Sequence, residues 1–495
     1  QQVYRAYCDV QGRMQDAEQV LKPWIIRHRR SPLLPDKRVP RRITLTGRAI
    51  QNGQGDNDEG IAIQDRALLP FLLAARIQSV IPRLSSHKRA THGTFAEGLA
   101  SSYEAYLDTR TAAKKDGKAK TILDEVDPAD MVSLHDDQAL SWYVHQLGRA
   151  LPNRQHFVLH PKIQATIDRT LALWEQGEKV LVFCHFRATG QSLVTHLNTA
   201  LNRRVNEIAA RKLGTSQKRA RQRLQTLDQA FEKDRLVYRA FERVFDELVA
   251  PFKFQLENEE CDSVREVLRR FIRTPSFFVR YFPLGARRPA EAFTRAVQAS
   301  DSSGLSLYNK LKDFVAFIAL RCEKAERDDY LRALTRVQPG RTVRLANGSV
   351  DVDDRQRLLL AFNTPFFPEI LVASRVLAEG VDLHLNCRYV IHHDLCWNPS
   401  TLEQRTGRID RIGAKAEQVK QPIHVFLPYL AGTQDEKMFR VVRDRERWFQ
   451  VIMGEKYALD EIYKGQIDTI ERRVPLPESA ATGLVLDLEV YTRDA

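Results

Sequence analysis

Short apolar runs bounded by polar residues recur along the chain, mostly in its second half. Five runs share this pattern: residues 179–186, 341–346, 369–374, 388–395 and 422–428. Such runs are typical of strands buried in a parallel sheet. Apolar residues at helical spacing lie between them, for example over residues 162–174 and 190–201. The alternation predicts an α/β fold, in which a parallel sheet has helices on both faces.

A long segment without strand patterns interrupts this alternation. Residues 201–340 separate the first predicted strand and helix from the second predicted strand. Within it, Leu311, Phe314, Val315 and Ile318 follow the i, i+3, i+4, i+7 spacing of a helix that buries one face. We therefore interpret the segment as a large helical insertion.

The charge balance is compatible with a polyanionic partner. The chain has 76 Lys and Arg against 63 Asp and Glu, a formal net charge of +13. Basic surfaces bind nucleic acids by neutralising phosphates, although a basic protein without such a partner fits the charge equally well. Eight Lys and Arg residues lie between Arg203 and Arg223 against the single acidic Glu207. This run is either a solvated helix face or a nucleic-acid contact.

Other compositional features narrow the class of protein. The six cysteines are scattered without a C-x-x-C pair, so neither a zinc site nor a disulfide framework is expected, and a reducing, cytoplasmic setting fits. No apolar run reaches eighteen residues, so no membrane span is predicted. His392 and His393 are neighbours on a predicted strand, where they should point to opposite faces, and we expect structural roles for them rather than a metal site.

The strongest chemical signal is the decapeptide QRTGRIDRIG at residues 404–413. It places Gln404, Arg408 and Arg411 within about two helical turns, with Gly407 allowing close approach. Arg408 and Arg411 are expected on one helix face, where both can converge on one anion. Two guanidinium groups aimed at a polyphosphate suit phosphoryl transfer, and the alternative is a basic helix with surface ion pairs.

Further polar residues follow the predicted strands. Ser374 and Gly380 should lie near the carboxyl ends of strands, where ligands bind in open α/β sheets. Asp382 could accept a hydrogen bond from a ribose hydroxyl, and Ser374 could donate one to a backbone phosphate. Trp397 and Asn398 belong to a turn that leads into the arginine decapeptide.

These segments resemble motifs IV, V and VI of superfamily 2 helicases, specifically of the Swi/Snf-like DNA translocases. KVLVFCHF (179–186) resembles motif IV, and EILVASRVLAEGVDLH (369–384) is similar to motif V. DLCWNPSTLEQRTGRIDRIG (394–413) is similar to the family's motif VI and the turn before it. Glu379, Gly380 and Asp382 replace a double glycine and an asparagine, which is closer to bacterial branches that remodel transcription complexes or act in antiviral defence.

The resemblance implies a RecA-like sheet and a division of roles among the motif residues. Arg408 and Arg411 would act on the γ-phosphate of ATP, while Gln404, Gly407, Gly380 and Asp382 would bind nucleotide or couple it to lobe closure. Double-stranded DNA is the implied partner. The residues expected near it are His185, Phe186, Arg187, Ser374, Arg375, Trp397 and Asn398.

The resemblance also implies a division of the chain. The second RecA-like lobe takes residues 156–200 and 341–430, and the insertion takes residues 201–340. The flanking parts are residues 1–45 (the end of a first lobe or an inter-lobe linker), 46–155 (a helical linker region) and 431–495 (a C-terminal helical brace).

The phosphate-cradling half of such a motor has no counterpart in this sequence. No G-x-x-x-x-G-K-[ST] motif is present. By resemblance, a first lobe precedes residue 1 and holds most of the ATP and Mg²⁺ contacts, so we expect the isolated chain to hydrolyse ATP poorly. Two alternatives stay open: half of an RNA helicase, and a non-catalytic module that binds a partner protein through residues 201–340.

Overall fold

The structure is a computed structural model, in which fourteen segments are described. They are residues 2–21, 33–35, 38–53, 59–84, 97–106, 142–143, 145–147, 149, 159–232, 235–300, 304–336, 342–348, 350–374 and 381–452. Two residues predicted to belong to the site, Arg375 and Gly380, lie outside these segments.

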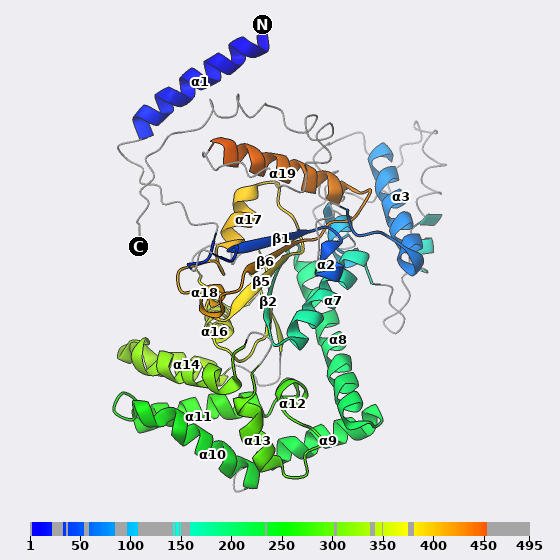
Figure 1. The fold of residues 1–495 in the computed structure, drawn as a ribbon. Coiled ribbons are helices and arrows are strands. Elements are labelled where there is room, and N and C mark those ends of the chain that lie inside the picture. Colours follow the sequence, from blue (N-terminus) through cyan, green and yellow to red (C-terminus); the bar gives the residue numbers. More distant parts are fainter. Residues whose placement is uncertain are drawn as a thin grey trace.

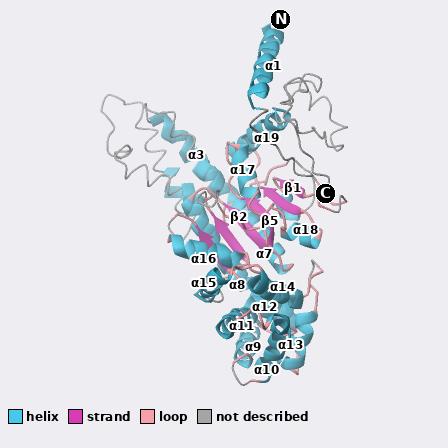
Figure 2. Cartoon of the chain, turned by 90° about the vertical axis from the view of Figure 1, so that its left-hand side faces the viewer, coloured by secondary structure: helices cyan, strands magenta, loops and turns pink. Residues whose placement is uncertain are grey.

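Six parallel strands form one sheet with the order β1-β6-β5-β2-β4-β3. The strands are β1 (Arg42–Thr46), β2 (Lys179–Phe183), β3 (Val343–Ala346), β4 (Ile370–Ala373), β5 (Cys387–His392) and β6 (Ile423–Leu427). The five strands from β2 to β6 confirm the predicted apolar runs. Helices cover the sheet on both faces, so the predicted α/β fold class is confirmed (Figure 1, Figure 2).

Strand β1 was not predicted from the sequence. It pairs with β6 in parallel, from Arg42 opposite Ile423 to Thr46 opposite Leu427. The boundary predicted at residue 45 therefore cuts through a strand of the sheet. As an edge strand with Arg42 and Ile43 half-buried and Thr44 exposed, β1 lacks the continuous apolar run that marks the central strands.

Alternate residues of each central strand bury opposite faces. Val180 and Val182 of β2 pack in one core with α7 (Pro161–Glu175) and α8 (Arg187–Leu213). Leu181 and Phe183 pack in a second core with α16 (Val352–Phe362) and α18 (Lys415–Val419). This two-residue period fixes which helices lie on which side of the sheet.

The predicted insertion is helical throughout its described residues. Helix α8 continues past the sheet, and seven further helices follow before β3. They are α9 (Gln217–Ala230), α10 (Leu236–Val249), α11 (Asn258–Ile272), α12 (Pro275–Tyr281), α13 (Pro289–Gln298), α14 (Leu307–Leu320) and α15 (Lys324–Arg336). A short 3-10 turn, η2 (Ala250–Phe252), follows α10.

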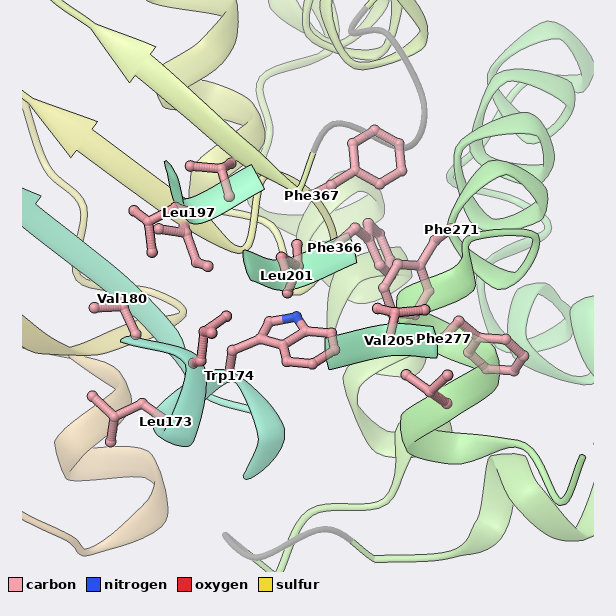
Figure 3. Packing of buried hydrophobic residues seen from close by; sticks show 14 of the residues in the cluster. Leu173, Trp174, Val180, Leu197, Leu201, Val205, Phe271, Phe277, Phe366 and Phe367 are labelled. Carbon is pink, nitrogen blue, oxygen red and sulfur yellow. The ribbon is translucent and has the colours of Figure 1, made fainter. Parts of the chain in front are cut away.

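The insertion and the sheet share one hydrophobic core. The ring of Phe366, just before β4, lies 5.0 Å from the ring of Phe271 in α11 and 4.9 Å from the ring of Phe314 in α14. Trp174 of α7 and Val205 of α8 belong to the same buried cluster (Figure 3). The insertion is therefore packed against the sheet domain rather than attached by a linker.

The remaining helices lie before α7 and after β5. They are α1 (Gln2–Leu21), α2 (Ala49–Asn52), the 3-10 turn η1 (Asp65–Ala67), α3 (Leu68–Leu84), α17 (Pro399–Thr406) and α19 (Gln434–Ile452). Met438, Phe439 and Val442 of α19 pack against Leu402 of α17, and the rest of the predicted brace, residues 453–495, lies outside the described segments. None of the helices in the described segments is both long and apolar enough to cross a bilayer.

One local prediction is wrong. Arg408 and Arg411 were expected on one helix face, but α17 ends at Thr406 and Gly407 is its C-cap. The two arginines therefore lie in the irregular segment after the helix. Their positions are set by contacts with neighbouring segments and not by helical periodicity.

Candidate nucleotide and nucleic-acid site

The arginine segment 407–415 lies directly beside segment 381–384, which carries Asp382. The backbone N–H of Leu383 donates to the carbonyl of Arg408 at 2.8 Å, and the N–H of Lys415 donates to the carbonyl of His384 at 2.9 Å. These bonds hold the two segments in fixed register. A displacement of one segment must therefore displace the other.

Side chains add to this link between the two segments. The Arg411 Nε lies 2.8 Å from Asp382 Oδ1, with both side chains partly exposed at 42% and 47%. Arg408 is buried, and its Nη1 donates to the carbonyl of Val381 at 3.5 Å. Three residues predicted separately to act on nucleotide, Asp382, Arg408 and Arg411, are thus brought together.

Strand β1 anchors the arginine segment from the other side. Asp410 lies between the two arginines and is buried, and it accepts a hydrogen bond at 2.7 Å from Nε of Arg41. Arg42 also binds Asp410 and reaches Glu403 of α17 at 2.7 Å. These contacts were not predicted from the sequence, because no sequence pattern indicates that residues 41 and 42 lie next to residue 410.

The other two residues of the decapeptide play different structural parts. Gln404 is exposed on α17. Gly407 has an ordinary helical φ, but an added Cβ would lie 3.2 Å from the carbonyl oxygen of Glu403. A larger residue at position 407 would thus crowd the end of α17.

A second group of predicted residues gathers at the carboxyl ends of β2 and β5. The backbone N–H of His185 donates to Oδ2 of the buried Asp394 at 2.6 Å. Burial opposes ionisation of this carboxyl. The charges of His393 and Lys162 and the bond from His185 nevertheless hold the pKa of Asp394 below its usual value. A small pocket lined by His185, Phe186, Asp394 and Lys162 lies over this group.

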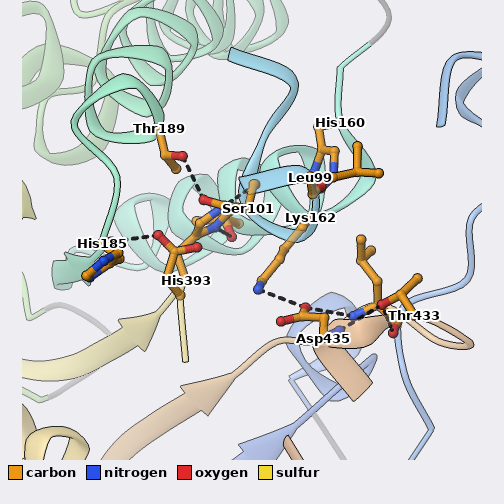
Figure 4. Close-up of polar contacts among 12 residues, drawn as sticks. Leu99, Ser101, His160, Lys162, His185, Thr189, His393, Thr433 and Asp435 are labelled. Atoms are coloured by element: carbon orange, nitrogen blue, oxygen red, sulfur yellow. Dashed lines mark hydrogen bonds and ion pairs between the residues drawn. The ribbon is translucent and has the colours of Figure 1, made fainter. Parts of the chain in front are cut away.

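Buried polar bonds fix this end of the sheet (Figure 4). Lys162 of α7 donates to Asp435 of α19 at 2.8 Å. His393 is hydrogen-bonded to Thr166 of α7 at 2.9 Å and to the carbonyl of Ser101 at 3.0 Å. Four segments far apart in sequence are therefore joined behind the exposed His185.

The two adjacent histidines do face opposite sides of the sheet. His392 is hydrogen-bonded to Thr406 at 3.0 Å and stacks on Phe183, while His393 contacts α7. Both are completely buried, and burial lowers the pKa of His392 to about 3 and that of His393 to about 4. Their hydrogen bonds support the structural roles that we expected.

Three further residues that were predicted to lie near DNA differ in their exposure and hydrogen bonds. Trp397 is 37% exposed, and its indole N–H donates to Glu97 at 2.6 Å. Asn398 caps α17, since its side chain accepts from the N–H of Ser400 at 3.0 Å. Arg187 is exposed at the start of α8.

Ser374, the last of these residues, is buried at the end of β4. Its backbone N–H donates to the carbonyl of Ala346 at 3.0 Å.

Arg405 is a buried residue that the sequence analysis did not single out. Its guanidinium lies 5.3 Å from the ring centre of Phe183, and its Nη1 donates to the carbonyl of Asp394 at 3.4 Å. Within the described segments, Nε and Nη2 of Arg405 have no hydrogen-bond partner. Arg405 connects the decapeptide to the end of β5, but its position next to Gln404 gives no sign of this in the sequence.

Comparison with known proteins identifies the family of this site. Residues 308–413 match the family described as Helicase conserved C-terminal domain, a range that contains both arginines. The uncharacterized ATP-dependent helicase YqhH of Bacillus subtilis (strain 168) is 31% identical over 107 residues, which cover 21% of this chain and 18% of that protein. The RNA polymerase-associated protein RapA of Pseudomonas putida (strain GB-1) is 29% identical over 120 residues, covering 24% of this chain and 12% of that protein.

Among solved structures, the C-terminal part of the Fun30 ATPase domain is similar at 14% identity, covering 54% of this chain and 89% of that chain. Its TM-score of 0.18 is too low to bear on the fold. The family match and the curated relatives, which extend well beyond the matched segments, agree with the motif residues described above. The chain therefore contains a helicase conserved C-terminal domain over residues 308–413, and over about a quarter of its length it is similar to ATP-dependent helicases of the Swi/Snf-like type.

Proposed function

We propose that this chain supplies the second motor lobe of an ATP-driven translocase that moves along double-stranded DNA. In this proposal ATP and Mg²⁺ are held mainly by a first lobe, and Arg408 and Arg411 reach the γ-phosphate across the interface. The observation that carries the proposal is the joint placement of Arg408, Arg411 and Asp382 in two bonded segments.

The surroundings of Arg411 suit a group that meets phosphate. Its only charged partner within the described segments is Asp382, which is about as exposed as Arg411 itself. Exposed ion pairs are weak, so a polyphosphate can compete with the carboxylate for the guanidinium.

The surroundings of Arg408 suit a coupling role. Its backbone and side chain are bonded to residues 381 and 383, so a shift of the arginine on phosphate binding would also move that segment. Segment 381–384 follows β4, whose carboxyl end is part of the expected DNA-facing edge. Closing and opening of the two lobes would then step the protein along the phosphate backbone.

The choice of nucleic-acid face rests on exposed groups at the carboxyl ends of β2 and β5. His185, Arg187 and Trp397 are exposed there, while the buried bonds of Asp394 and Lys162 hold the surface behind them rigid. A rigid, partly basic edge suits contacts to a phosphate backbone.

Substitution of Arg411 tests the proposal. In a protein extended to include a first lobe, Arg411→Ala should lower duplex-stimulated ATP turnover by about 10³, because trans-acting arginines stabilise the charge of the transferring phosphoryl group. Steady-state ATPase measurements with saturating duplex DNA give this number. Arg440→Ala is the matched control, since Arg440 is exposed on α19 and pairs with Glu436. Turnover of Arg411→Ala within a few fold of the control would contradict the assigned role.

A further inference from the structure

The hairpin formed by α8 and α9 carries a strongly basic stretch, with eight Lys and Arg residues between 203 and 223. Four of these side chains are used within the fold. Arg203 pairs with Glu207, Arg204 pairs with Glu175, Lys212 donates to the carbonyl of Val279, and Arg223 donates to the carbonyl of Leu284. These four basic groups have structural roles.

The other four basic side chains are exposed. They are Arg211 at the end of α8 and Lys218, Arg219 and Arg221 on α9. Within the described segments, none of them has an ion pair or a side-chain hydrogen bond. We call these four residues the hairpin cations. Four unpaired positive charges within eleven residues repel one another, so an anionic partner would lower their energy.

The hairpin cations border two hollows in the surface. Arg221 lines a cleft of about 1050 Å³ between α9 and α11, and Lys218 lies one helical turn before it. Arg211 and Arg219 line a second hollow at the turn between α8 and α9. Arg221 thus lines a groove, and Arg211 and Arg219 lie at the neighbouring turn.

The far wall of the cleft is also basic. Arg269 and Arg270 share the single carboxylate of Glu266, and Arg273 pairs with Asp228 across the cleft. Together with Arg221, the lining has four guanidinium groups against two carboxylates. The surplus of positive charge leaves donors available for an incoming phosphate.

The hairpin is remote from the motor site. Helix α8 starts next to His185 and runs for 27 residues, which corresponds to about 40 Å. Figure 1 places α9 at the opposite end of the molecule from α17 and α19. A change in the hairpin cations therefore leaves the proposed nucleotide and DNA contacts of the sheet edge untouched.

We propose that the hairpin cations and the adjoining cleft bind the phosphate backbone of duplex DNA, as a second contact separate from the motor face. Flexible Lys and Arg side chains without fixed partners suit contacts that neutralise phosphates and do not read bases. The second contact would hold the DNA while the motor lobes open. The proposal depends on the proposed function only in the choice of duplex DNA as the partner.

The salt dependence of DNA binding tests this proposal. The binding constant of the chain for a fluorescent 30-base-pair duplex is measured by anisotropy at several KCl concentrations. Because each neutralised phosphate contributes about 0.9 to the slope of log K against log salt, the variant R211Q/K218Q/R219Q/R221Q should lower the slope by about 3 to 4. A control with the same charge change, R288Q/R295Q/K324Q/R332Q, alters exposed residues elsewhere in the insertion and should retain most of the slope.

Two results would overturn the proposal: an unchanged slope in the hairpin variant, or an equal loss in both variants. Circular dichroism confirms that each variant is folded.

In the extended protein, the hairpin variant should need at least about tenfold more duplex for half-maximal ATPase stimulation, with unchanged turnover at saturation. If the slope of log K against log salt falls in the hairpin variant but duplex does not stimulate ATP turnover, the proposed motor function fails and the hairpin contact stands. If duplex stimulates ATP turnover and the salt slope of the hairpin variant equals that of the wild type, the hairpin proposal alone fails.

Discussion

At the scale of single residues, the site depends on arginines whose surroundings differ sharply. Arg411 is partly exposed and pairs with Asp382, whereas Arg408 is buried against the backbone of residue 381. Arg405 is fully buried below them and contacts Phe183. One decapeptide thus combines a group available to ligands, a group that links two segments and a group that belongs to the core.

Sequence reasoning found some of these residues and missed others for a physical reason. Arg408, Arg411 and Asp382 could be predicted because their motifs are local and chemically unusual. The partners of Asp410 could not, because Arg41 lies 369 residues away and only the pairing of β1 with β6 brings the two together. The predicted helical face for the arginines was wrong because α17 ends at Thr406.

The buried histidines predict a stability loss in mild acid. Burial lowers the pKa of His160 and His392 to about 3 and that of His393 to about 4. In the unfolded chain these groups take up protons below about pH 6.5, while the folded protein does not. Stability therefore falls as pH decreases from about 6.5 towards about 4, by roughly 1.4 kcal/mol per pH unit for each histidine.

Urea unfolding followed by tryptophan fluorescence at pH 7.5, 6.0 and 5.5 measures this loss. Burial also lowers the pKa of His424 to about 4, so four histidines of the described segments contribute to this slope. Replacement of His393 with Asn removes one of them, and the free energy of unfolding of the variant should depend on pH about a quarter less steeply than in the wild type. The exposed His185→Asn variant is the control and should keep the wild-type slope. A His393→Asn variant with the full wild-type slope between pH 6.0 and 5.5 would show that His393 is not buried in its neutral form.

At the scale of secondary-structure elements, α12 connects the insertion to the sheet through a buried ion pair. Arg280 of α12 pairs with Glu369 at the start of β4, and both side chains are only 6% exposed. Glu369 also accepts from the indole N–H of Trp174 at 2.7 Å, and the Arg280 guanidinium lies 5.0 Å from the Trp174 ring. One carboxylate thus joins α7, α12 and β4.

Removal of Arg280 should destabilise the whole chain. Arg280→Ala leaves the charge of Glu369 buried without its main partner, which costs about 3 to 5 kcal/mol in comparable cases. Thermal or urea unfolding measures the change. The double variant Arg280→Met/Glu369→Gln removes both charges and should recover most of the loss. If the double variant is no more stable than Arg280→Ala, the unpaired charge is not the cause of the loss.

The elements themselves were largely predictable. The central strands β2 and β4 are fully buried, and continuous apolar runs in the sequence predict them. Strand β1 was missed because an edge strand with one partner needs no such run. The helices of the insertion followed from their apolar spacing, but their packing onto Phe366 did not, since that contact joins residues far apart in the sequence.

At the scale of the whole molecule, the insertion and the sheet share one hydrophobic core, so we expect them to move together. The cluster around Trp174 and Phe366 is continuous from α7 into α11 and α14 (Figure 3). A step of the lobe would therefore displace the hairpin cations by a comparable or larger distance, because they lie at the far end of α8. Both proposed DNA contacts belong to parts of the chain that share this core, which suits a motor that pulls on a duplex.

The central claim is that this chain supplies the second lobe of an ATP-driven motor whose turnover duplex DNA stimulates. The most direct test is ATP turnover, with and without duplex DNA, of this chain and of a protein extended to include a first lobe. We predict that the chain alone shows little turnover, and that duplex DNA stimulates turnover of the extended protein more than RNA does. An extended, folded protein that hydrolyses ATP equally with and without duplex DNA, or not at all, would contradict the claim.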